Sequence, residues 1–170
     1  MDTWDAIRSR RNVREFANQP VSREQIDRIL EAGRLSPSAR NGQPWDFIAV
    51  MERGRLTELA GVWRGAWHVA GAPAVIAIVA PRVTDREEEL LYFDLGQAVM
   101  LMMLSASDQG LGTGHAAVSD QGLAQRLLGF PSDRFLAYML SVGYPADGPL
   151  RPLRRLNRRP FEQVVHRETW

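Results

Sequence analysis

The run of residues 73–80 restricts the fold of this chain more than any other feature. After Pro73 it contains only Ala, Val and Ile, with no polar position. A strand with one face in water would alternate polar and apolar residues, so this run predicts a strand covered on both faces. The chain has 170 residues, enough for one domain with apolar layers above and below such a strand.

Patterns elsewhere predict the remaining elements. Two further apolar stretches, 45–51 and 135–142, predict strands, and 111–118 fits either a strand or a loop. Helical spacing or helix caps predict helices at residues 1–9, from residue 22 onward, at 55–67, at 85–109 and at 121–128. Strands and helices that mix without a regular βαβ repeat indicate an α+β fold, here one domain over residues 1–170.

The helix predicted at 85–109 is the longest element. Thr84 and Glu87 form a capping box at its start, as Ser22 and Gln25 do for the second helix. Residues 99–104 are apolar on nearly every side, which is typical of a helix in the centre of a fold or at a subunit interface. The pattern fits both positions, and the second would make the chain a homodimer.

The composition excludes several kinds of chemistry. The chain has no cysteine, which excludes disulfides, thiolate metal sites and a cysteine nucleophile. Its histidines His68, His115 and His166 lack the spacing of a zinc motif, so we expect no metal. There is no Walker loop and no Gly-x-Ser-x-Gly motif, and the glycine-rich segment 110–114 lacks the third glycine of a dinucleotide fingerprint. Redox chemistry would therefore need a bound cofactor.

Charge and hydropathy restrict the possible partners. The formal net charge of +1 disfavours general binding to nucleic acid. The charged N-terminus does not resemble a secretory signal, and the apolar stretch 98–106 is about half as long as a membrane span. We therefore expect a cytoplasmic protein with no membrane partner. All 21 positive residues are arginine, whose planar donors suit phosphate.

The first candidate binding segment is Arg-Arg-Asn-Val-Arg-Glu-Phe at residues 10–16. Arg10 and Arg14 are four residues apart, near the end of the first predicted helix. Two guanidinium groups and the amide of Asn12 can hold a phosphate dianion through charge-assisted hydrogen bonds. An arbitrary segment of this composition is more often a solvated basic turn.

The second candidate segment is Pro-Ser-Ala-Arg-Asn-Gly-Gln-Pro-Trp at residues 37–45. Its small residues, two amides and two prolines indicate a rigid loop of exposed donors and acceptors. Such a loop suits a flat heterocycle with hydrogen-bonding edges. An ordinary connection between a helix and a strand fits the composition equally well.

In this order and spacing, the two segments resemble motifs of the nitroreductase family of FMN-dependent oxidoreductases. The family motifs read Arg-Arg-Ser-x-Arg-x-Phe and Pro-Ser-x-x-Asn-x-Gln-Pro-Trp. The resemblance continues over nearly the whole chain, with Asp-Leu-Gly-Gln-Ala at 94–98, Gly-Leu-Gly at 110–112, Val-Gly-Tyr-Pro at 142–145 and Arg-Arg-Pro-Phe-Glu-Gln-Val-Val-His at 158–166. It implies a three-layer α+β fold with a mostly antiparallel central sheet flanked by helices, assembled as an intertwined homodimer.

The resemblance also implies which residues bind FMN. Arg10, Arg11 and Asn12 would hold its phosphate and ribityl chain, and Arg14 would lie near the pyrimidine edge of the flavin. Arg158, together with Arg159, would close on the phosphate from the tail.

Two further groups of residues complete the implied site. The loop of the second subunit would line the flavin with Pro37, Ser38, Asn41 and Gln43. The stretch His115, Ala116 and Ala117 would pass along the flavin, with backbone amides near its N5 atom. A packing or surface role for His115 is as compatible with the sequence as a contact.

The chain departs from the family pattern in three respects. Asn12 stands where serine is commoner, and no lysine is available for the pyrimidine edge, so Arg14 has to serve there. The chain is also short and lacks the helical excursion that covers the substrate in longer members. The substrate therefore cannot be assigned by analogy.

The implied activity is a ping-pong transfer of two electrons from NAD(P)H, through the N5 atom of FMN, to a small organic acceptor such as a nitroaromatic compound or a quinone. One alternative keeps the fold but binds a deazaflavin or consumes reduced flavin. Another is a binding module without enzymatic activity that uses its arginines to contact nucleic acid. The near-zero net charge disfavours this last alternative.

Overall fold

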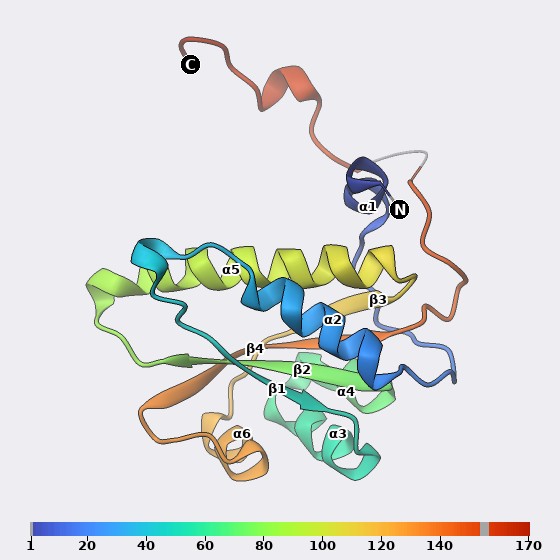
Figure 1. Ribbon diagram of the computed structural model, residues 1–170, viewed down its shortest axis with the longest axis vertical. Helices are drawn as coiled ribbons and strands as arrows, with labels where there is room; N and C mark the ends of the chain where they lie inside the picture. The colour runs from blue at the N-terminus through green and yellow to red at the C-terminus, as the bar shows by residue number, and fades with distance from the viewer. Residues whose placement is uncertain (1, 154–156) are drawn as a thin grey trace.

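The computed structural model describes residues 2–153 and 157–170, and its centre is a four-stranded sheet (Figure 1). The strands are β1 (Asp46–Val50), β2 (Ala74–Pro81), β3 (Gly112–Ala116) and β4 (Arg134–Gly143), in the order β1-β2-β4-β3. Every pair of neighbours is antiparallel. The α+β prediction is confirmed, and the segment that fitted either a strand or a loop contains the edge strand β3.

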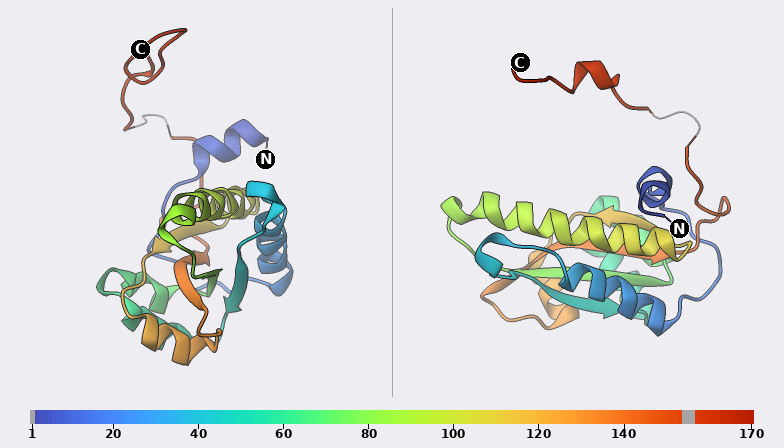
Figure 2. Two further views of the ribbon diagram at one scale, coloured as in Figure 1. Left: turned by 90° about the vertical axis from the view of Figure 1, so that its left-hand side faces the viewer. Right: turned by 45° about the horizontal axis from the view of Figure 1, so that its top comes forward.

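Helices cover both faces of the sheet, as the uninterrupted apolar run required (Figures 1 and 2). One face carries α2 (Arg23–Arg34) and α5 (Asp85–Asp108), and the other carries α3 (Arg53–Leu59), α4 (Trp67–Gly71) and α6 (Gln121–Leu128). Alternate residues of β2 enter different cores. Ile76 and Ile78 pack on the side of α5, whereas Val75 and Val79 pack on the side of α3 and α6. The predicted three-layer architecture is confirmed.

The two capping boxes begin α2 and α5 at the predicted positions. The N–H of Gln25 donates to Ser22 Oγ over 3.2 Å, and the N–H of Ser22 donates to Gln25 Oε1 over 3.0 Å. The hydroxyl and the N–H of Thr84 both donate to the carboxylate of Glu87. These bonds satisfy donors that the first helical turn leaves unpaired.

The single helix predicted for 55–67 is wrong. The chain forms α3, then the 3₁₀ turns η2 (Ala60–Val62) and η3 (Arg64–Ala66), and only then α4. Trp63 breaks the helix because its backbone is extended, with φ −160° and ψ 136°. The glycines on either side of it, Gly61 and Gly65, favour the break. Trp63 and Trp67 are 37% and 57% exposed.

The long helix α5 is the central helix of its layer. Its length and mean hydropathy would also suit a membrane span, but half of that stretch is buried within the fold. Leu95, Ala98 and Met102 lie fully buried against the sheet and α2. Its outer face nevertheless carries exposed apolar side chains, including those of Phe93 and Met100.

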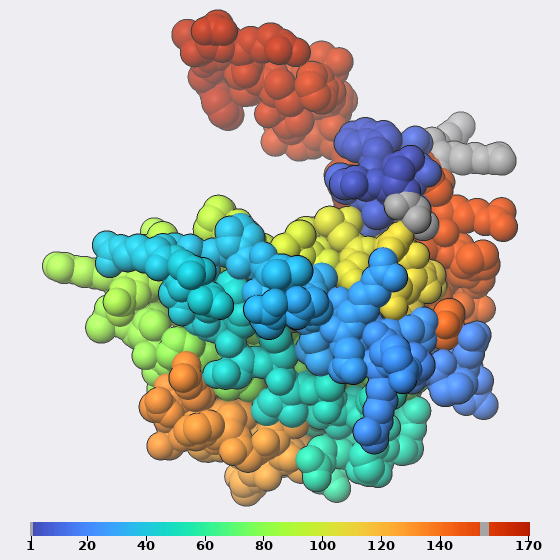
Figure 3. All heavy atoms as spheres, viewed as in Figure 1, coloured from blue at the N-terminus to red at the C-terminus, as the bar shows by residue number. Residues whose placement is uncertain are grey.

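The two ends of the chain lie on the same side of the sheet as α5. Helix α1 (Thr3–Ser9) contacts α5, and it lies near the C-terminal end of that helix (Figures 1 and 2). The tail from residue 157 to 170 contains the short turn η4 (Phe161–Gln163), and every one of its residues is exposed. Figure 3 shows its atoms standing clear of the layered body.

Candidate functional site

The arginine-rich segment that follows α1 lies along the free edge of β3. The N–H of Val13 donates to the carbonyl of Thr113 over 2.8 Å. Farther along, the N–H of Ala17 donates to the carbonyl of Tyr144, just past β4. The segment therefore extends the sheet beyond its last strand, and this pairing fixes Arg10, Asn12 and Arg14 beside β3.

Two glycines of β3 make this close approach possible. A Cβ atom on Gly112 would overlap with the side chain of Val13, and a Cβ atom on Gly114 would overlap with the carbonyl oxygen of Val13. The Gly-x-Gly pattern of β3 is thus explained by the backbone that passes over it.

Positive charge gathers where this segment meets His115. Burial lowers the pKa of His115, and the nearby Arg10 and Arg14 lower it further. Arg11 is engaged differently, because its guanidinium lies 3.8 Å from the carboxylate of Asp147. The segment and Asp147 together line a cavity of about 250 Å³. Two arginines, Arg11 and Arg14, line this cavity together with the carboxylates of Glu15 and Asp147. Guanidinium groups can bind an anion such as a phosphate group.

His115 is held from two sides. Its Nδ1 atom lies 3.3 Å from Asn12 Oδ1, and its carbonyl accepts a hydrogen bond from His68 Nε2 over 3.1 Å. Ala116 is buried, so it can offer a ligand only its backbone, whereas Ala117 is exposed. The structure thus brings together the predicted residues of the arginine segment and of the stretch that begins at His115.

The second predicted segment forms a strained loop around η1 (Ala39–Asn41). Three residues that are not glycine, Arg40, Asn41 and Gln43, have positive φ angles of 54°, 55° and 47°. Ser38 Oγ accepts a hydrogen bond from the N–H of Gln43 over 2.9 Å, which closes the loop on itself. Strained backbone of this kind concentrates at functional sites.

The loop is tied to α5 by a residue whose role the sequence interpretation missed. The N–H of Ala39 donates to both carboxyl oxygens of Asp94, over 2.9 and 3.2 Å. Asp94 is only 4% exposed. A carboxyl group within an otherwise apolar stretch of helix was the available signal, because such a group is buried only when it has a partner.

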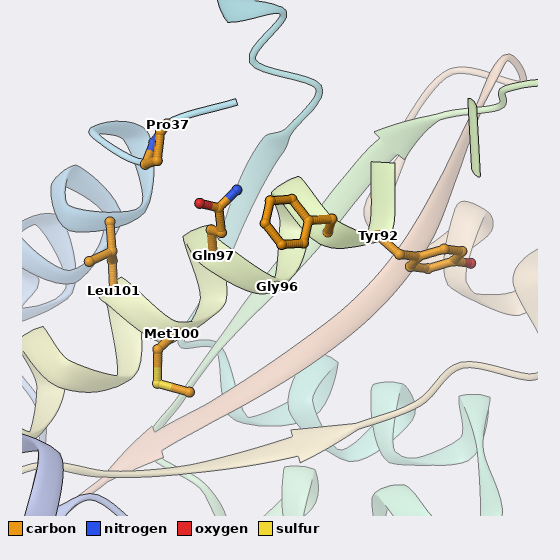
Figure 4. Close-up of a pocket in the computed structure, with 7 residues that line it drawn as sticks. Pro37, Tyr92, Gly96, Gln97, Met100 and Leu101 are labelled. Atoms are coloured by element: carbon orange, nitrogen blue, oxygen red, sulfur yellow. The ribbon is translucent and has the colours of Figure 1, made fainter. Parts of the chain in front are cut away.

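One chain does not bring the loop and the arginine segment together. The loop lies over the N-terminal half of α5, where Asp94 holds it, whereas α1 and the arginine segment lie towards the other end (Figure 1). The region between them is an apolar trough along α5. Its larger cavity, of about 610 Å³, is lined by Pro37, Tyr92, Phe93, Gly96, Gln97, Met100 and Leu101 (Figure 4).

A smaller cavity continues this trough to His115. It measures about 240 Å³, shares Gly96 and Met100 with the larger one, and is also lined by His115 and Tyr138. An apolar channel therefore runs along α5 from the strained loop to His115.

The tail arginines lie outside this arrangement. Arg158 donates to the carbonyl of Asn157 and Arg159 to the carbonyl of Gln163, both over 2.7 Å. These bonds remain within the tail, which stands clear of the body (Figure 3). Contact of Arg158 and Arg159 with a phosphate group stays a prediction.

Comparison with known proteins identifies the family. The model of the nitroreductase family matches residues 7–67 and 62–144. The chain belongs to the nitroreductase family. The matched region contains the arginine segment, the strained loop, α5 and β3.

Relatives of this nitroreductase-family chain cover it almost completely. It is 29% identical over 169 residues to a protein of Archaeoglobus fulgidus provisionally named an NADH dehydrogenase/NAD(P)H nitroreductase, with 96% of each chain covered. It is 28% identical to the FMN reductase [NAD(P)H] of Bacillus subtilis, with 97% of this chain and 73% of that protein covered. The solved structure of an FMN-dependent nitroreductase from Clostridium difficile has the same fold, with a TM-score of 0.83, 23% identity and coverage of 97% of this chain and 98% of that chain.

Asp94→Ala is expected to release the strained loop of this nitroreductase-family chain. We expect the free energy of unfolding to fall by about 1–3 kcal/mol, the range for hydrogen bonds to charged groups. Asp94→Asn keeps an oxygen that can accept from Ala39, so its loss should be smaller. Urea unfolding of the two variants measures the difference, and equal losses would show that the bond to Ala39 contributes nothing.

Proposed function

We propose that this chain is an FMN-dependent oxidoreductase that takes electrons from NAD(P)H. One observation carries the proposal, namely the arginine segment held beside β3, whose Arg10 and Arg14 lie close enough to His115 to lower its pKa and whose Arg11 and Arg14 line a cavity. A phosphate group suits this cluster because guanidinium groups bind phosphate with charge-assisted hydrogen bonds. FMN also fits because the apolar trough that begins at His115 can accept a flat ring. The FMN named in two of the compared proteins supports the same cofactor.

When bound, FMN supplies the transfer of two electrons, for which this chain has no side chain of its own. Arg10, Arg11 and Asn12 bind the phosphate and the ribityl chain. Arg14 would place a positive charge near the pyrimidine edge of bound FMN, where a cation favours the reduced form. The backbone from His115 to Ala117 supports the ring near its N5 atom.

NAD(P)H and the acceptor would bind one after the other at the same open face of the flavin, in a ping-pong cycle. The apolar lining of the trough along α5 supports a flat and mostly apolar acceptor, such as a nitroaromatic compound or a quinone. The chain acts as one domain over residues 1–170 and works in the cytoplasm.

The active form is a homodimer, in which the loop containing Pro37, Ser38, Asn41 and Gln43 completes the site of the partner. Within one chain this loop and the arginine segment lie towards opposite ends of α5 (Figure 1). Large apolar side chains are exposed on α1, on α5 and in the tail, namely Trp4, Ile7, Leu90, Phe93, Met100, Phe161 and Val164. Exposed apolar surface of this extent is typical of a subunit interface. The exposed tail, with Arg158 and Arg159, is free to reach the phosphate in such an assembly.

Purification followed by absorption spectroscopy and a turnover assay tests the proposal. We expect a dimer that retains one FMN per chain, shows the visible band of a flavin and oxidises NAD(P)H when quinones or nitroaromatic compounds are supplied. A bound deazaflavin would give a different spectrum. Nucleic acid binding that weakens steeply with salt, without NAD(P)H oxidation, would contradict the proposal.

A further inference from the structure

His68 is a buried histidine that joins three elements of the fold, the helix α4 and the strands β3 and β4. It belongs to α4, below the sheet, and is 1% exposed. Its Nδ1 atom lies 3.0 Å from Ser141 Oγ on β4, and its Nε2 atom lies 3.1 Å from the carbonyl oxygen of His115 on β3. The ring of Trp67 packs edge-on against it, with 5.9 Å between centroids. Both ring nitrogens are therefore engaged.

These partners determine the tautomer of His68. A carbonyl oxygen can only accept, so Nε2 must carry the proton that it donates to His115. Nδ1 then accepts from the hydroxyl of Ser141, which can rotate to donate. Burial and the positive charge of Arg14 lower the pKa of His68, which keeps this neutral form at pH 7. The orientation of the ring is thus fixed without a net charge in the core.

The bond to His115 completes the outer edge of β3. Thr113 and His115 are two residues apart, so their carbonyl groups leave the strand in the same direction. The carbonyl of Thr113 is satisfied by the N–H of Val13, and the carbonyl of His115 by His68. His68 thus supplies the hydrogen-bond donor for the outward carbonyl of β3 that the arginine segment does not pair with. By the same alternation, this edge directs the N–H group of His115 outward.

Gly114 allows both contacts at one point of the strand. A Cβ atom there would overlap with the carbonyl oxygen of Val13, and it would also lie 3.3 Å from Cε1 of His68. The arginine segment and the imidazole therefore hold the same short stretch of β3 from two directions.

We propose that His68 is a positioning residue that fixes the edge of β3 from His115 to Ala117 for flavin binding, through its hydrogen bond to the carbonyl of His115. The inference rests on the proposed function, because the flavin is the ligand that this edge would meet. His68 does not touch the flavin. It acts by holding the carbonyl of His115 in place, so that the N–H group of His115 and the backbone that follows it stay in position.

A pair of amide variants tests the contributions of the two ring nitrogens of His68 separately. The side-chain NH₂ of glutamine reaches the position of Nε2 in histidine, whereas that of asparagine reaches only the position of Nδ1. We expect His68→Asn to raise the dissociation constant of FMN about tenfold, as expected for the loss of one buried hydrogen bond, and to shift the midpoint potential of bound FMN. For His68→Gln, the dissociation constant of FMN should stay within about threefold of that of the unchanged chain.

Val69→Ala, on the same helix, is the control for general destabilisation. Val69 is fully buried in the core of α3 and α6 and has no bond to β3. We expect it to lower the midpoint of thermal unfolding and to leave the dissociation constant and the potential of FMN unchanged. Equal FMN affinity and potential in His68→Asn and His68→Gln would overturn the proposal. So would an affinity that falls with thermal stability alike in all three variants.

FMN binding by the unchanged chain distinguishes failure of this inference from failure of the function on which it rests. If the unchanged chain does not bind FMN, the proposed function fails, and the assignment of His68 fails with it. If the unchanged chain binds FMN and the two amide variants behave alike, only the role of His68 is overturned.

Discussion

Arg14→Ala is expected to weaken FMN binding by roughly 10- to 100-fold, the cost of losing a charge-assisted hydrogen bond to a ligand. The midpoint potential of bound FMN should also fall. Arg14 contributes the positive charge proposed for the pyrimidine edge, and the chain contains no lysine to replace it. Titration of FMN followed by fluorescence gives the affinity, and equilibration with reference dyes gives the potential.

A second readout of Arg14→Ala does not depend on the flavin. The charge of Arg14 lowers the pKa of both His68 and His115. Its removal should therefore raise both pKa values, which NMR titration of the histidine rings can follow. Arg34→Ala is the matched control, because Arg34 forms an exposed ion pair with Glu31 on α2. Full FMN occupancy with an unaltered potential in Arg14→Ala would remove this residue from the proposed site.

The second large effect is expected from Gly114→Ala. The added methyl group would overlap with the carbonyl oxygen of Val13, which is backbone and cannot turn away as a side chain can. Either the arginine segment leaves β3 or the strand shifts, and both displace the guanidinium groups from His115. We expect a loss of about 1–3 kcal/mol in the free energy of unfolding, the usual cost of overpacking, together with loss of measurable FMN binding.

Gly71→Ala is the control for this substitution. A Cβ atom on Gly71, in α4, meets no neighbour within 4 Å. Alanine is also the better helix former, so this variant should unfold at the same or a higher urea concentration and bind FMN normally. If Gly114→Ala behaved like Gly71→Ala, the close passage of Val13 over β3 would not matter for the site.

Local sequence patterns predicted an element correctly where a single interaction, such as a helix cap or the burial of an apolar run, determines its structure. The capping boxes at Ser22 and Thr84 begin α2 and α5 as expected, because a cap depends only on residues three positions apart. The apolar run of β2 is buried on both faces because no polar side chain in it could face water. The helix predicted through Trp63 is wrong because the prediction gave more weight to the spacing of the apolar residues than to the two glycines. In the structure the helix is broken at Trp63, between these glycines.

The site was predicted only in part. The arginine segment and the loop were recognised because their order and spacing resemble the motifs of the nitroreductase family, although the chemistry of each segment alone also fitted an ordinary turn or connection. Asp94 and His68 were not assigned roles, because each acts through a single backbone group that is distant in sequence, the N–H of Ala39 and the carbonyl of His115. No local pattern reports such a bond.

The sequence alone determined the layers and the residues able to bind a phosphate group, since these follow from hydrophobic periodicity and from the chemistry of individual side chains. The cofactor class was implied by the resemblance of its motifs to those of the nitroreductase family. Only the tertiary structure decided which of those residues meet. It placed Arg10 and Arg14 beside His115 and left the strained loop towards the far end of α5. The physical reason is that these contacts depend on the pairing of β3 with the arginine segment, which joins residues about one hundred positions apart along the chain.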